Sequence, residues 1–156
     1  MNKKDCVLSI IITAHREGLV AHKTMKSVER AVKKIEKASI SYEVIVSIDR
    51  GDDQTIDYFN NYTGLPIHIY QWDHGDLSSS RNSAIKKAHG QFVSFIDADD
   101  LMSENWLHDS VQLLLKKPYG KYVAHSAYTI EFEGADSIVQ KTGCTTCLLY
   151  TSDAAD

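Results

Sequence analysis

Runs of apolar residues alternate with amphipathic segments from residue 7 to about residue 115. The apolar runs are rich in β-branched residues and predict strands over 7–12, 42–48, 67–72 and 92–96. Between them, helical spacing of apolar residues predicts a helix from Val20 onward, with Met25, Val28, Val32 and Ile35 on its buried face. Further helices are expected over 55–61, over 78–89 before Gly90, and after Ser103, which is placed to cap the last of them. A fifth strand is expected over 121–132.

This alternation of strands and helices favours one α/β domain with a parallel sheet and right-handed crossovers. In such sheets, ligands bind beyond the carboxyl ends of the strands. Polar clusters follow three of the predicted strands, at 13–17, 49–53 and 97–100. We therefore expect the functional site at this edge of the sheet.

Three carboxylates occur within four positions after the strand Phe92–Ile96, at Asp97, Asp99 and Asp100. Crowding like charges at the end of a buried strand is unfavourable, and a bound divalent cation would offset that cost. Carboxylate oxygens suit Mg²⁺ or Mn²⁺ holding a diphosphate. The simpler alternative is an acidic turn, in which Asp100 or Ser103 caps the next helix.

The composition narrows the class of protein without identifying it. The chain has 156 residues, 43% of them hydrophobic, and a formal net charge of -4. This charge provides no basic field for nucleic acid, and no apolar segment is long enough to span a bilayer. We expect a cytoplasmic location from the three cysteines, which suggest no disulfide framework, and from the absence of a secretory signal. Peripheral attachment to a membrane remains open.

The end of the chain differs in character from the rest. Residues 147–156 match one reading frame through a transposase adapter used in shotgun sequencing. We therefore expect a domain over residues 1–143 and a non-native or disordered tail over 144–156, with the natural gene continuing past Gly143. A native frayed C-terminus is the alternative.

Four stretches occur in the order and spacing typical of one enzyme family: Ser9–Glu17, Tyr42–Asp49, Gly75–Asn82 and Gly90–Asp100. Together they make the chain resemble the family 2 glycosyltransferases over roughly residues 7 to 107. The resemblance implies the GT-A fold, a Rossmann-like, mostly parallel sheet flanked by helices, here incomplete at the C-terminus. It also implies a nucleotide-sugar donor, usually a UDP-sugar, and Mn²⁺ or Mg²⁺ as cofactor.

The same resemblance assigns expected roles to individual residues. Asp99 is expected to ligate the metal directly, with Asp97 nearer the ribose or the metal's water shell. Asp49 matches the position that accepts the uracil N–H, with a loop aspartate bonded to its own turn as the alternative. Arg81 is expected to bind the diphosphate, with a surface pair to Asp76 as the alternative. The expected donor-binding residues are Thr13, Ala14, His15, Glu17, Asp49, Arg81 and Asp97; the metal ligands are Asp99 and Asp97.

Two positions depart from the family pattern. Arg50 stands where the family usually has a second aspartate, and it cannot accept a hydrogen bond, so contacts to base or ribose in this loop can differ. His15 replaces a common tyrosine, and its ring can still stack on a base.

The expected reaction is transfer of a sugar to an acceptor hydroxyl with inversion, as in polysaccharide biosynthesis. The catalytic base is unknown and is expected to be missing from this chain, because Glu131, Glu133 and Asp136 qualify only by residue type. The acceptor is open among glycan, lipid and protein. The alternatives are a non-catalytic module that binds nucleotide-sugars and, less favoured, an aspartyl phosphatase, whose motif usually has a threonine soon after the second aspartate.

Overall fold

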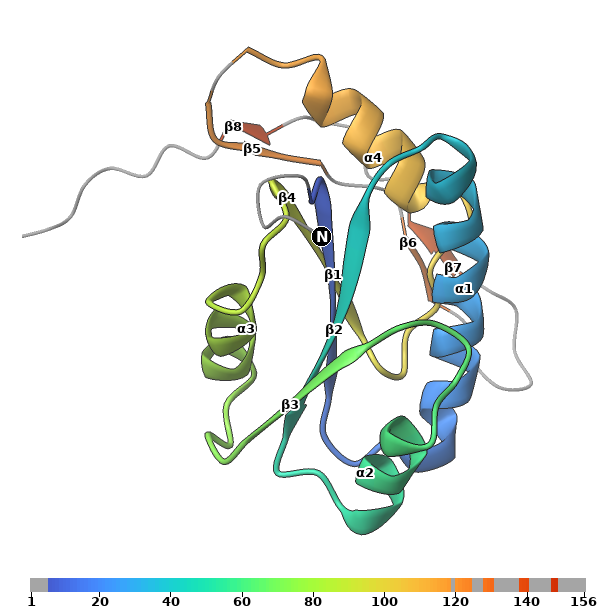
Figure 1. Ribbon diagram of the computed structural model, residues 1–156, viewed down its shortest axis with the longest axis vertical. Coiled ribbons are helices and arrows are strands. Elements are labelled where there is room, and N and C mark those ends of the chain that lie inside the picture. Colours follow the sequence, from blue (N-terminus) through green and yellow to red (C-terminus); the bar gives the residue numbers. More distant parts are fainter. Residues whose placement is uncertain (1–5, 119, 125–127, 131–137, 141–146, 149–156) are drawn as a thin grey trace, which may run out of the picture. The chain divides into compact units, whose positions relative to one another are not determined.

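A four-stranded parallel sheet forms the centre of residues 1–108, the first of two units in the computed structural model (Figure 1). The structure describes residues 6–118, 120–124, 128–130, 138–140 and 147–148. The four strands are β1 (Leu8–Ala14), β2 (Tyr42–Asp49), β3 (His68–Trp72) and β4 (Phe92–Asp97). They lie in the order β3-β2-β1-β4, and every neighbouring pair is parallel. The predicted α/β fold with a parallel sheet is confirmed.

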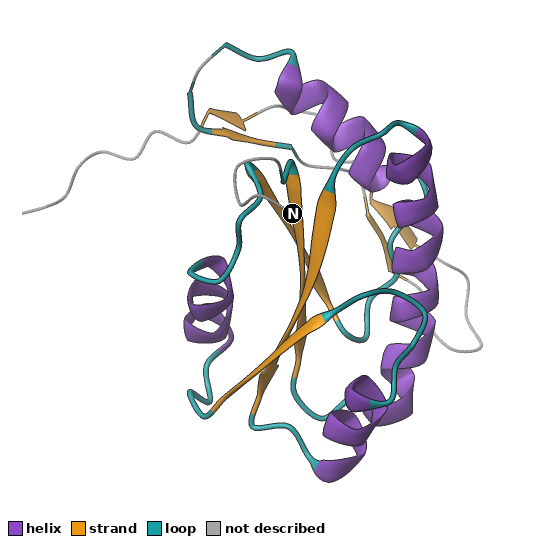
Figure 2. Ribbon diagram, in the orientation of Figure 1, coloured by secondary structure: helices purple, strands orange, loops and turns teal. Residues whose placement is uncertain are grey.

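Helices cover both faces of this sheet (Figure 2). A short 3₁₀ turn, η1 (Gly18–Val20), leads into α1 (Ala21–Lys37), which lies with α2 (Asp53–Asn60) on one face. The opposite face carries α3 (Leu77–Ile85). This arrangement follows from right-handed crossovers that proceed in one direction from β1 to β3 and then reverse to reach β4.

The core lies between the sheet and these helices. All seven residues of β1 are buried, as expected for a strand covered on both faces. The predicted apolar face of α1 is also buried, with Met25, Val28, Val32 and Ile35 at 0% exposure. On the other face, Ile11 and Ile45 pack with Ala84 of α3.

Two aspartates begin the helices that follow β2 and β3. The side chain of Asp52 accepts a hydrogen bond from the Thr55 N–H at 2.9 Å, and that of Asp76 accepts one from the Ser79 N–H at 2.7 Å. Each bond satisfies one amide that has no partner within its helix. These caps determine where α2 and α3 begin, next to the carboxyl edge of the sheet.

The prediction that the third helix reaches His89 is wrong, because α3 ends at Ile85. After α3 the chain forms a tighter turn, in which the Lys87 N–H donates a hydrogen bond to the Ala84 carbonyl, three residues earlier, at 2.9 Å. Gly90 allows a close approach to β1 instead of ending the helix. A Cβ atom there would lie 2.4 Å from the Ser9 nitrogen, and the Gly90 N–H donates to the Ser9 hydroxyl at 2.8 Å.

The helix α4 (Trp106–Leu115) is the predicted fourth helix, and its positions Leu107 and Val111 are buried. In the second unit, residues 109–156, β5 (Tyr122–Val123) pairs antiparallel with β8 (Cys147–Leu148), and β6 (Tyr128–Ile130) pairs antiparallel with β7 (Ile138–Gln140). The single strand predicted over 121–132 is therefore wrong where the structure describes it, since β5 and β6 belong to different sheets. The expected domain boundary at 143/144 lies outside the described residues.

None of the helices in the described ranges has the length and apolar character needed to cross a membrane.

Candidate functional site

The candidate site lies at the carboxyl ends of β1, β2 and β4. From β1 the chain proceeds to β2 and β3 on one side, whereas β4 lies on the other side of β1. This reversal of strand order makes a switch point between β1 and β4, where open α/β sheets bind ligands. The polar residues predicted from the sequence follow these strand ends.

Thr13, Arg81 and Asp97 form a cluster at the switch point. Thr13 lies opposite Asp97 in the register of β1 and β4, and its hydroxyl donates to Oδ1 of Asp97. The Arg81 guanidinium donates to the same oxygen at 2.6 Å. Arg81 therefore pairs with Asp97, whereas Asp76, the alternative partner, caps α3. Oδ2 of Asp97 is left for a ligand.

Arg81 also retains capacity for a further hydrogen bond. Its Cζ lies 5.6 Å from the centre of the Phe95 ring, which supports the planar group from β4. Its Nε is buried and has no hydrogen-bond partner among the described residues. A buried donor without a partner is unfavourable unless a ligand supplies an acceptor. The Arg81 side chain as a whole is 34% exposed, so another part of its guanidinium is accessible to an anionic oxygen.

Hydrogen bonds with β1 and α1 fix the backbone of the acidic turn after β4. The Ala98 N–H donates to the Thr13 carbonyl at 2.9 Å, and the Thr24 hydroxyl donates to the Ala98 carbonyl at 2.7 Å. Asp99 and Asp100 are exposed at this turn. Partial desolvation of its carboxyl, followed by the nearby charges of Asp99 and Asp97, raises the pKa of Asp100 above its ordinary value. The charges of Asp97 and Asp99 therefore repel that of Asp100.

These carboxylates suit a divalent ion whose ligands come partly from the protein and partly from a bound substrate. In the part of the chain that the structure describes, no three His, Cys, Asp or Glu side chains converge into a site made by protein alone. Mg²⁺ is commonly bound by only one or two carboxylates, together with water and substrate phosphates. Asp99 and the second oxygen of Asp97 can provide such ligands, and the repulsion around Asp100 would be relieved by a cation.

Asp49 ends β2 beneath the loop that connects β3 to α3. One of its oxygens accepts from the His74 N–H at 2.7 Å and the other from the Asp76 N–H at 3.0 Å. Burial alone would raise the pKa of Asp49, but hydrogen bonds from the amides of residues 74–76 outweigh it and lower the pKa. The partners of Asp49 thus belong to another loop, not to its own turn. Each carboxylate oxygen keeps acceptor capacity.

The loop after β1 contacts the same region. The His15 ring bonds through Nδ1 to the main-chain oxygen of Asp49, and the His15 N–H donates to Glu17 at 2.6 Å. Ala14, the last residue of β1, is buried. The structure therefore forms two groups from the predicted residues. Thr13, Arg81 and Asp97 make one, and His15 and Asp49 make the other, with Glu17 bracing the loop.

The sequence analysis did not predict the interactions made by the segment 70–76. Tyr70, Trp72 and His74 stack in a row, with ring centres 6.0 Å and 5.7 Å apart. Arg50 donates to Asp73 at 2.6 Å. The alternate spacing of Tyr70 and Trp72 on β3, continued by His74 two residues beyond the end of the strand, was a usable signal, because residues i and i+2 of a strand share a face. The contact between Arg50 and Asp73 has no comparable signal.

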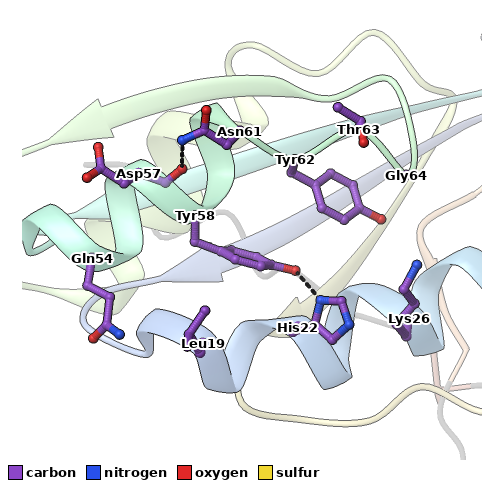
Figure 3. A pocket seen from close by; sticks show the side chains of 10 residues that line it. All are labelled: Leu19, His22, Lys26, Gln54, Asp57, Tyr58, Asn61, Tyr62, Thr63 and Gly64. Atoms are coloured by element: carbon purple, nitrogen blue, oxygen red, sulfur yellow. Dashed lines mark hydrogen bonds between the residues drawn. The ribbon is translucent and has the colours of Figure 1, made fainter.

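A groove of about 550 Å³ lies elsewhere, between the start of α1 and α2 (Figure 3). Tyr58 bonds to His22 across it at 3.4 Å, and Tyr62 donates to Glu29 of α1 at 2.6 Å. None of the predicted site residues lines this groove. It is therefore separate from the cluster around Asp97.

Comparison with known proteins places the chain in a family. The model of the family "Glycosyl transferase family 2" matches residues 9–144, which include all the residues of the candidate site. The chain is also similar to the poly(ribitol-phosphate) beta-N-acetylglucosaminyltransferase TarP of Staphylococcus aureus, with 31% identity over 65% of this chain and 31% of TarP. It is similar as well to WfgD of Escherichia coli, a UDP-Glc:alpha-D-GlcNAc-diphosphoundecaprenol beta-1,3-glucosyltransferase, with 25% identity over 76% of this chain and 46% of WfgD.

Solved structures agree on the fold. The structure of residues 1–349 of S. aureus TarS in complex with UDP-GlcNAc matches 70% of this chain and 31% of that one, with a TM-score of 0.59 and 24% identity. This likeness confirms the GT-A-like arrangement of the sheet and its helices. The chain spans less than half the length of TarP and WfgD. By its family match and its fold, the chain belongs to glycosyl transferase family 2.

Proposed function

We propose that this chain is the donor-binding part of a glycosyltransferase that uses a UDP-sugar and a divalent metal ion. The observation that carries the proposal is the cluster of Thr13, Arg81 and Asp97 at the switch point between β1 and β4. Membership of the family supports it, as does the binding of UDP-GlcNAc by TarS, which has the same fold.

In this proposal the donor diphosphate lies by Asp99 and by the accessible part of the Arg81 guanidinium, whose side chain is 34% exposed. A metal ion held by Asp99 and Asp97 would stabilise the charge of the diphosphate. Thr13 keeps Asp97 in position, and Asp97 faces the ribose with its second oxygen. The nucleoside then extends over β1 toward β2, where Ala14, His15, Glu17 and Asp49 surround the base.

The acceptor hydroxyl attacks the anomeric carbon of the donor sugar from the side opposite the diphosphate, which inverts that centre. The bond from this carbon to the diphosphate oxygen breaks, UDP leaves, and a general base takes the proton of the hydroxyl. The candidates Glu131, Glu133 and Asp136 lie outside the described residues. The relatives act on poly(ribitol-phosphate) and on a lipid-linked GlcNAc, as their names state. We extend from them only the class of acceptor, a hydroxyl group of a polymer or of a lipid-linked sugar.

Calorimetry of UDP binding with and without Mn²⁺ tests the donor site. We expect affinity that depends on manganese and that is lost in Asp99→Asn. A parallel assay with UDP-[¹⁴C]GlcNAc measures donor hydrolysis and transfer to poly(ribitol phosphate). Binding without either reaction would favour the non-catalytic module for this chain, whereas absence of manganese-dependent UDP binding in folded protein would refute the proposal.

A further inference from the structure

We propose that Arg50 determines the base specificity of the donor site, because its guanidinium binds the O4 carbonyl of uracil and disfavours cytosine. This inference rests on the proposed function, since it requires a nucleoside diphosphate with its phosphates at the cluster of Thr13, Arg81 and Asp97. It adds a role for a residue at which this chain departs from the pattern of its family.

The strand order places Arg50 at the base end of the site. Arg50 directly follows β2, whereas Asp97 ends β4, and β1 lies between these two strands. Neighbouring strands are about 4.8 Å apart, so the two strand ends are separated by roughly 10 Å. That separation suits the distance from a diphosphate to the far edge of a pyrimidine. Arg50 is therefore placed to contact the base, while Arg81 contacts the phosphates.

The Arg50 side chain is held in one orientation by the loop after β3. Its Nε donates to Asp73 at 2.6 Å. Its terminal nitrogen lies 2.2 Å from where a Cβ atom of residue 75 would stand, so the guanidinium can lie there only because residue 75 is glycine. The two terminal nitrogens have no hydrogen-bond partner among the described residues, and half of the side chain is exposed. Donors are thus available to a ligand without breaking the contact to Asp73.

Stability alone does not account for this arrangement. Arg50 has a φ of 52°, in the left-handed region that is unfavourable for residues with a side chain. Its ion pair joins side chains that are 51% and 85% exposed, and exposed pairs of this kind stabilise a fold little. The backbone is held there by a 3.0 Å bond from the Arg50 N–H to the Trp72 carbonyl. Residues that hold an unfavourable backbone conformation, and whose contacts add little to the stability of the fold, are concentrated at ligand sites.

The chemistry of the two neighbouring side chains selects the base. A guanidinium can only donate hydrogen bonds and the Asp49 carboxylate can only accept them. Uracil presents a C4 carbonyl beside its N3–H, which matches a donor beside an acceptor. Cytosine presents an amino group at C4 and an unprotonated N3, so that both contacts are mismatched. Arg50 therefore favours uracil in the same way that an arginine favours a carbonyl-bearing base edge in nucleic acids.

Calorimetric titration of UDP and of CDP in the presence of Mn²⁺ tests the inference on three forms of the chain. Wild type should bind UDP at least tenfold more tightly than CDP. Arg50→Gly should lose roughly tenfold in UDP affinity, the value of one hydrogen bond to a charged group, and should bind CDP at least as tightly as wild type does. Because glycine suits the backbone at φ 52°, this variant should melt no lower than wild type. Arg30→Ala, which removes another exposed arginine paired to Glu104, is the control and should bind as wild type does.

The possible failures are distinguishable. If wild type binds UDP and CDP equally, or if Arg50→Gly weakens both by the same factor, the role of Arg50 is refuted and the proposed function is untouched. If folded wild type binds neither nucleotide with Mn²⁺, both the proposed function and this inference are refuted.

Discussion

Thr13 and Asp97 lie directly opposite each other in the register of β1 and β4, and the Thr13 hydroxyl donates to Oδ1 of Asp97. Arg81 donates to that same oxygen. With two donors on Oδ1, the rotation of the carboxylate is restricted, and no hydrogen bond to its other oxygen is made among the described residues. In the proposed donor site, this arrangement exists before a nucleotide-sugar binds, which would reduce the entropy lost on binding.

Replacing Thr13 by valine tests this pre-organisation, because valine retains the shape of the side chain and removes the hydroxyl. We expect several-fold weaker manganese-dependent binding of UDP and a loss of about 1 kcal/mol in the free energy of unfolding. Calorimetry and urea denaturation measure the two effects. Ser9→Ala removes a buried hydroxyl at the other end of β1 and should lower stability without changing UDP affinity. Equal affinity in Thr13→Val and wild type would contradict this role for Thr13.

Asp99 is expected to ligate the metal directly, because its carboxylate is exposed and has no hydrogen-bond or ion-pair partner among the described residues. Asp99→Asn should bind UDP with the same affinity in Mn²⁺ and in EDTA, while its melting temperature stays within a few degrees of wild type. Isothermal titration and a thermal melt measure these quantities. Asp57→Asn, at an exposed position of α2, should respond to manganese as wild type does. A manganese effect of wild-type size in Asp99→Asn would rule out direct ligation.

The core between β1, β2 and α3 should be sensitive to lost volume. Ile45 is 1% exposed and packs with Ile11 and Ala84. Ile45→Ala should lower the free energy of unfolding by about 2–5 kcal/mol, since it leaves a cavity that the two covered faces cannot close. Urea denaturation measures the change. Leu19→Ala, at a side chain with 67% exposure, should cost less than about 0.5 kcal/mol. A similar small cost for Ile45→Ala would mean that the core is loosely packed.

Glu43 should give the fold a dependence on pH. Burial raises the pKa of Glu43, but the Ser9 hydroxyl and the His89 N–H bond to the carboxylate and bring the pKa below its ordinary value of 4.5. A lowered pKa means that the ionised group stabilises the fold above pH 4.5 and that this contribution is lost as the pH falls through the folded-state pKa.

Glu43→Gln should therefore be less stable than wild type by about 1–2 kcal/mol at pH 7, the value of charge-assisted hydrogen bonds. The difference should shrink toward pH 3, where wild type also loses the charge. Urea midpoints at the two pH values measure it. The same difference at both pH values would show that hydrogen-bond geometry, not charge, accounts for the effect.

The strands of the first unit could be predicted because they consist of runs of apolar, mostly β-branched residues, which are typical of buried strands. Ile10, Ile11 and Ile12 are buried on consecutive positions, and only a strand covered on both faces buries neighbours in this way. The edge that carries the site could be predicted for a related reason. Parallel strands end together, so polar clusters that follow different strands must converge there.

Contacts between loops could not be predicted in the same way. The partners of Asp49 are backbone amides, which every residue except proline carries, so nothing in the sequence distinguishes His74 and Asp76 as donors. The strands β5 and β6 are short and their residue types resemble one longer strand, yet β5 pairs with the distant β8 while β6 pairs with the nearby β7. Pairing of this kind depends on the surrounding fold more than on local preference.

The close approach of Gly90 to Ser9 has a consequence for the opposite end of the sheet. From Leu8 and Phe92 to Thr13 and Asp97 the strands β1 and β4 run in unbroken register, a length of roughly 17 Å. A methyl group at position 90 would clash with the backbone of Ser9 and push β4 away from β1 at their amino ends. Because the two strands are hydrogen-bonded in register, such a displacement would extend along their length. A substitution at Gly90 is thus expected to disturb the position of the Asp97 carboxylate, although Gly90 lies at the opposite end of the strand pair.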